Sequence, residues 1–117
     1  MPSIRIGNTE NLTSSSRNSS IYTWPGGSGT LAVQGDLDGG SVYLYVAIDP
    51  DEENTANFAQ FSDQSGTVLT LGSTTGATQM RAITVDMPRC NYYIGVLGGT
   101  SPDVDVSFTM VNNRRMQ

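Results

Sequence analysis

The sequence predicts an all-β domain, an antiparallel β-sandwich of about eight strands with jelly-roll or immunoglobulin-like connections. Apolar and polar residues alternate repeatedly between Thr30 and Asn112, clusters of glycine or proline interrupt the alternation, and no stretch shows a convincing helical period. A period of two places successive side chains on opposite faces of a sheet, so that one face can be buried. Short strands separated by regularly spaced turns are typical of a sandwich or a barrel.

The first nineteen residues are predicted to be a polar arm. Residues 7–20 are small and polar except for Leu12, so they bury too little surface to offset the entropy lost on ordering. Ile4, Arg5 and Ile6 before them predict a short strand that pairs at a sheet edge or on a neighbouring subunit. The expected division of the chain is an arm at 1–19, a sandwich at 20–113 and a tail at 114–117.

The expected strands end at glycine, proline or acidic turns. In order they are 20–24, 29–36, 41–49, 57–61, 67–71, 79–87, 91–97 and 103–112. The turn Asp38-Gly39-Gly40 indicates a hairpin-like pair of the second and third strands, and residues 98–102 indicate a final hairpin. The alternation predicts a core of Leu31, Val33, Val42, Leu44, Val46, Ile48, Ile83, Val85, Ile94, Val96, Val104, Val106, Phe108 and Met110.

The face of strand 41–49 opposite to this core is unusually apolar. It carries Tyr43, Tyr45 and Ala47, and the pair Tyr92-Tyr93 adds to it. These tyrosines either flank the core at a sheet edge or mark a surface buried against another protein, because tyrosine is enriched in interface cores.

The composition restricts the chemistry of the protein. The formal net charge is -5, all six basic residues are arginine, and the chain has no lysine and no histidine. Acidity disfavours a nucleic-acid partner, and no apolar run is long enough to cross a membrane. Without histidine, the common nucleophile pairs and most zinc sites are missing. We therefore expect no enzyme, no cofactor and no metal. Because no secretory signal is evident, synthesis in a cytoplasm is expected.

Acidic residues and the lone cysteine fit structural roles. The cluster at 49–54 lacks the glycine and glutamate of a calcium loop, so it predicts a solvated loop. Asp36 and Asp38 fit turn chemistry before Gly39. Cys90 is the only cysteine and is expected to be a small core or turn residue.

Two further features leave alternatives open. Trp24, before Pro25-Gly26, is expected to be an anchor at the edge of the core, whereas an exposed Trp24 could stack on a sugar ring. Arg114 and Arg115 either belong to a solvated tail or form a basic clasp for an acidic partner surface.

The layout of residues 20–112 resembles small virion proteins of tailed bacteriophages, most of all head decoration (cement) proteins. The resemblance lies in a polar arm, the run Gly29–Val46, the loop at Asp49-Pro-Asp51, an aromatic segment at Phe58–Phe61, a Thr/Gly-rich link at Gly72–Gly76 and a final hairpin at Asn91–Ser101. It implies an all-β fold and attachment to the outside of a capsid. The expected partners are the major capsid protein and further copies of the chain, a trimer being favoured.

We accordingly expect a capsid decoration protein on the virion exterior. The expected interface residues are Ile4, Arg5, Ile6, Trp24, Tyr43, Tyr45, Arg114 and Arg115. The alternatives are a carbohydrate-binding or adhesin-like module of a phage tail or fibre, and a small hydrolase that uses Asp36, Asp38 or Asp49.

Overall fold

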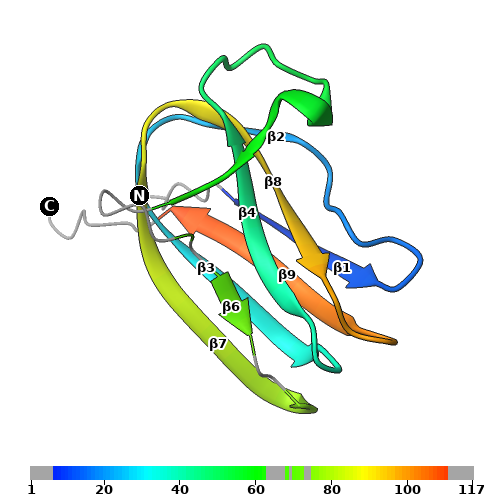
Figure 1. Ribbon diagram of the computed structural model, residues 1–117. Helices are drawn as coiled ribbons and strands as arrows, with labels where there is room; N and C mark the ends of the chain where they lie inside the picture. The colour runs from blue at the N-terminus through cyan, green and yellow to red at the C-terminus, as the bar shows by residue number, and fades with distance from the viewer. Residues whose placement is uncertain (1–6, 63–67, 69, 73–74, 111–117) are drawn as a thin grey trace, which may run out of the picture.

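The computed structural model describes residues 7–62, 68, 70–72 and 75–110, which form two antiparallel sheets packed face to face (Figure 1). Sheet A contains, in spatial order, β1 (Gly7–Thr13), β9 (Asp103–Met110), β3 (Gly27–Asp36) and β7 (Thr75–Met87). Sheet B contains β2 (Tyr22–Trp24), β8 (Cys90–Leu97) and β4 (Ser41–Ala47), and both β5 (Ala59–Gln60) and β6 (Thr70–Gly72) pair with the free edge of β4. The predicted all-β sandwich is confirmed.

The pairing of the strands is nested. The first strand pairs with the last (β1 with β9), the second with the one before it (β2 with β8), and β3 pairs with β7. The innermost strand, β4, pairs with the two short strands β5 and β6. This is the order of a long antiparallel ribbon rolled into two sheets, which is the jelly roll of the two connection patterns predicted.

Both expected hairpins are wrong, because the two turns are corners between the sheets. The turn at Asp38-Gly39-Gly40 leads from β3 in sheet A to β4 in sheet B, and residues 98–102 lead from β8 back to β9. The acidic side chains do serve the turn as expected: the Asp38 backbone N–H donates to Asp36 Oδ1 at 2.8 Å, and Asp38 has a positive φ of 50°. The alternation of apolar and polar residues predicts which face of the sheet each side chain occupies, but it does not predict which strand pairs with which.

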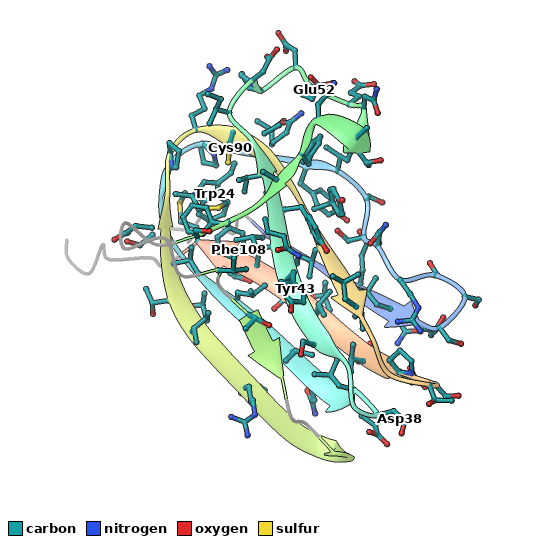
Figure 2. The ribbon with its side chains drawn as sticks, viewed as in Figure 1. Trp24, Asp38, Tyr43, Glu52, Cys90 and Phe108 are labelled. Carbon is teal, nitrogen blue, oxygen red and sulfur yellow. The ribbon has the colours of Figure 1, made fainter. Side chains whose placement is uncertain are left out.

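The core lies between the two sheets and contains most of the predicted residues. Figure 2 shows two of its rings, Trp24 and Phe108, side by side. Of the predicted residues, Val46, Ile83 and Met110 are partly buried and pack against the core. Ile48 is a wrong prediction: it follows the end of β4 and is 81% exposed. The core also holds residues that the alternation did not place inward, namely Leu12, Trp24, Leu37, Met87, Cys90 and Tyr92.

The predicted arm is wrong over residues 7–13, which form the edge strand β1. All seven of these residues are in register with β9, from Gly7 opposite Thr109 to Thr13 opposite Asp103. Leu12 is 1% exposed and fills the core beneath this edge. Backbone pairing along the full strand, together with one buried leucine, orders a segment whose other side chains are polar. Ile4, Arg5, Ile6, Arg114 and Arg115 lie outside the described residues.

Candidate functional site

The outer face of sheet B, which points away from sheet A, is the most distinctive surface of the described molecule. β8 is buried on both sides, because every residue from Cys90 to Val96 is buried. Its inward residues join the core, and its outward residues Asn91, Tyr93 and Gly95 are covered by other parts of the same chain. The loop after β4 covers one end of this face, with Glu52 in it (Figure 2).

Four rings on this face form a group that we call the aromatic patch: Tyr43 and Tyr45 on β4, Tyr93 on β8, and Phe58 before β5. Tyr45 and Tyr93 are direct cross-strand partners whose rings stack with centroids 4.6 Å apart and planes at 7°. The Phe58 ring lies 5.3 Å from that of Tyr93, and the Tyr43 ring 6.4 Å from that of Tyr45. Tyr93 is only 7% exposed, whereas the other three are partly exposed.

Gly95 makes room for this arrangement. A Cβ atom added to Gly95 would lie 2.9 Å from Cε1 of Tyr45 and 2.7 Å from Oδ1 of Asn18. The segment before β2 runs beside β8 at this point, since the Ser19 N–H donates to the Ile94 carbonyl at 2.8 Å and the Val96 N–H donates to the Arg17 carbonyl at 2.9 Å. The missing side chain therefore lets the Tyr45 ring and the Asn18 amide approach the sheet.

Next to the aromatic patch lies a cleft of about 620 Å³, which we call the acidic cleft. Its lining residues come from β2 and its approach, from β8 and from the loop after β4: Ile21, Thr23, Pro50, Asp51, Glu53 and Asn91. Asn91 is 4% exposed; it accepts a hydrogen bond from the Thr23 hydroxyl and donates to the Glu52 carbonyl, both at 2.8 Å. This buried amide thus ties the loop to sheet B.

Short-range hydrogen bonds shape the loop itself. Asp49 Oδ1 accepts from the Asp51 N–H at 2.9 Å, Glu52 Oε2 from the Asn54 N–H at 3.1 Å, and Asn54 Oδ1 from the Ala56 N–H at 3.0 Å. The last of these bonds caps a short 3₁₀ helix, η1 (Thr55–Asn57). Asp49, Asp51 and Glu53 are exposed, so the expected solvated acidic loop is confirmed.

The opposite end of the outer face is held by an arginine. The Arg17 guanidinium donates to the carbonyl oxygens of Gly98 and Gly99, at 2.6 and 3.2 Å. One planar cation thus binds two adjacent acceptors, the kind of contact for which arginine differs from lysine. Leu97 beside this turn is 48% exposed, which extends the apolar surface along β8.

A second, smaller acidic cleft of about 240 Å³ lies on sheet A. Its carboxylates belong to Asp103 and Asp105, and the Asn11 amide donates to both, at 2.9 and 3.2 Å. These two hydrogen bonds therefore join β1, which carries Asn11, to β9, which carries both carboxylates. Asp103 and Asp105 differ in this respect from Asp51 and Glu53, which accept no hydrogen bond within the described residues.

The structure separates the expected interface residues into groups. Tyr43 and Tyr45 lie on the outer face, as predicted. Trp24 does not: it is fully buried, its ring stacks on Phe108 with centroids 4.3 Å apart, and its edge meets Tyr92. Its role as a core anchor is confirmed, and its role as an interface or sugar-stacking residue is wrong because no partner can reach the ring.

Burial changes the acidity of two groups on β8. Burial, and to a smaller degree the neighbouring Tyr45, raises the pKa of Tyr93 above its ordinary value. Burial raises the pKa of the Cys90 thiol to about 11, so this thiol stays protonated near neutral pH. Among the described residues, no three histidine, cysteine or carboxylate side chains gather in a way that could hold a metal ion.

Asn91 and Phe58 are site residues that the sequence did not indicate on the outer face. Tyr93 was expected to add to that face together with Tyr92, but Tyr92 lies in the core. Tyr93 shares the parity of Asn91 and Gly95 on β8, and that parity is the signal that could have placed it beside Tyr45. The position of Phe58 depends on the path of the loop, for which the alternation gives no signal.

Comparison of the chain with protein-family models, curated proteins and solved structures found no match. The described part of the chain also contains no helix long and apolar enough to cross a membrane.

Proposed function

We propose that this protein is a non-catalytic structural component of a bacteriophage virion, a decoration protein that binds the outer surface of the head and stabilises it. The observation that supports this function is the aromatic patch. Partly exposed tyrosine and phenylalanine rings gathered on a rigid sheet are typical of a surface that another protein covers.

The partners in this proposal are the major capsid protein and further copies of the chain, with a trimer favoured. The outer face of sheet B docks on the capsid, and burial of its rings supplies apolar contact area. An acidic domain with a formal net charge of -5 is a poor ligand for nucleic acid. The protein acts outside the capsid after synthesis in the host cytoplasm.

Cosedimentation with purified heads of the phage that encodes the chain tests this function. Wild-type protein is expected to sediment with heads, and the variant Tyr43→Ala/Tyr45→Ala to bind at least about tenfold more weakly, because interface aromatic residues are typical hot spots. The matched control is Thr30→Ala/Thr84→Ala, a pair of facing residues on the outer side of sheet A. Failure of wild-type protein to sediment with heads would refute the proposal.

A carbohydrate-binding module of a tail or fibre is the second candidate. The observation that favours it is the position of the aromatic patch beside a polar cleft of about 620 Å³, a size common for small-molecule sites. Binding to a glycan array that is lost in Tyr43→Ala/Tyr45→Ala, without binding to heads, would establish this alternative.

A further inference from the structure

We infer that the acidic cleft and the aromatic patch together form a binding site for a basic, arginine-bearing segment of the protein on which this domain docks. The inference rests on the proposed docking function and adds the chemistry of the partner.

The two sheet residues that line the cleft, Thr23 and Asn91, both donate hydrogen bonds to other groups of the protein. The Thr23 hydroxyl donates to Asn91, and the Asn91 amide donates to the Glu52 carbonyl. The carboxylates of Asp51 and Glu53 accept no hydrogen bond and form no ion pair within the described residues, although both line the cleft. A ligand that complements this site must bring several donors and a positive charge, which describes a guanidinium or an ammonium group.

The walls of the cleft suit the rest of a long basic side chain. Ile21 and Pro50 supply apolar surface beside the carboxylates, and arginine and lysine bury their methylene stems on such surface while the charged head stays near water. A volume of about 620 Å³ accommodates more than one side chain. The cleft therefore fits part of a peptide segment.

The aromatic patch continues the same site along β8. Asn91 and Tyr93 are alternate residues of this strand and point to the same face, so they lie about 7 Å apart along it. Cations are attracted to the faces of tyrosine and phenylalanine rings, and arginine also stacks on them. An extended segment that crosses from cleft to patch can place one basic side chain in each.

The loop beside the cleft is strongly acidic. Asp51 and Glu53 line the cleft, and Asp49 and Glu52 lie in the same loop. Two arginines lie along β8: Arg89 precedes the strand and does not line the cleft, and Arg17 is bound to the carbonyls of Gly98 and Gly99 at the other end. Complementary charge steers and orients partners. Charge complementarity thus selects a basic protein segment over a second copy of this acidic chain.

A peptide titration tests the inference without heads. The probe is a fluorescein-labelled synthetic peptide, Gly-Ser-Arg-Gly-Arg-Gly-Ser, compared with the same peptide containing citrulline in place of arginine. The arginine peptide is expected to bind wild-type protein at least about tenfold more tightly than the citrulline peptide, and more weakly as salt is added. Asp51→Asn/Glu53→Gln is expected to remove this preference.

The control variant is Asp103→Asn/Asp105→Asn, which neutralises the other acidic cleft and is expected to bind like wild type. Circular dichroism confirms the folding of both variants. Equal binding of the two peptides, no binding of the arginine peptide by folded wild-type protein, or equal loss in the two variants would each overturn the inference.

Heads separate this inference from the proposed function. If wild-type protein sediments with heads and Asp51→Asn/Glu53→Gln sediments equally well at all salt concentrations, the docking function stands and the basic partner segment is refuted. If wild-type protein does not sediment with heads, the docking function fails, and the peptide titration alone decides whether the site binds basic segments. The inference would also be refuted if the cleft bound a neutral oligosaccharide but did not bind the arginine peptide.

Discussion

At the scale of single residues, Gly29 shows how closely the core is packed. This glycine lies in β3 opposite Val85, and a Cβ atom there would come within 2.6 Å of the Phe108 ring and 2.8 Å of the Trp24 ring. We expect Gly29→Ala to lower the free energy of unfolding by about 1–3 kcal/mol, because overpacking displaces buried rings. Urea unfolding measures the effect. Thr30→Ser, at the outward neighbour, is the control, and an equal loss there would contradict the explanation.

Trp24 provides a spectroscopic test of its own burial. It is the only tryptophan in the chain and is fully buried, so its fluorescence reports one environment. We expect blue-shifted emission that acrylamide quenches poorly in the folded protein and efficiently in urea. Emission at the position of solvated tryptophan would show that the ring is exposed.

The Cys90 thiol gives a prediction about pH. Burial raises its pKa from 9.0 to about 11. As the pH rises above 9.0, the unfolded chain loses a proton that the folded chain keeps, so the stability falls until the folded thiol also ionises near pH 11. Urea unfolding between these pH values is expected to show a shallower fall for Cys90→Ala than for wild type. Parallel pH profiles would contradict this assignment.

At the scale of elements, one polar contact joins the edge strands of the two sheets. The Tyr22 hydroxyl of β2 donates to the Glu10 carboxylate of β1, which also accepts from the Ser20 N–H at 3.0 Å. Burial, and then the bond and charge of Glu10, raise the pKa of Tyr22 above 10.0. The Tyr22 hydroxyl therefore stabilises the folded state at neutral pH, and this stabilisation is lost as the pH rises through the raised pKa of Tyr22.

A double-mutant cycle measures this contact. Tyr22→Phe and Glu10→Ala are each expected to lower the free energy of unfolding by about 1 kcal/mol or more, with a coupling energy of about 1 kcal/mol because either change removes the bond between Tyr22 and Glu10. Additive effects of the two substitutions would show that the hydroxyl and the carboxylate do not interact.

At the scale of the whole molecule, the pairing of the first strand, β1, with the last strand, β9, predicts different effects for two truncations. A chain that begins at Gly7 keeps every described strand, whereas a chain that begins at Ser14 loses β1, exposes the edge of β9 and removes Leu12 from the core. We expect the longer truncation to lower the melting temperature and to aggregate, since unpaired edges invite association. Equal melting temperatures of the two truncated proteins would contradict a structural role for β1.

The sequence predicted the parts of this molecule that depend on local alternation. The sandwich, the strands around Leu31, Val42 and Val104, and the outward position of Tyr43 and Tyr45 all follow from side-chain parity. The nested partners do not, because pairing β1 with β9 depends on residues nearly a hundred positions apart. The strand Gly7–Thr13 was not predicted, because backbone hydrogen bonds order it and the polarity of its side chains does not reveal those bonds.

The pairing of β1 with β9 also brings the two ends of the described fold together, with Gly7 directly opposite Thr109. Such proximity suits insertion into a host protein, because the host chain would enter and leave the guest at one place. Residues 7–110 could therefore be inserted into a loop of an unrelated enzyme through two short glycine linkers, and the inserted domain would fold without disrupting the structure of the enzyme.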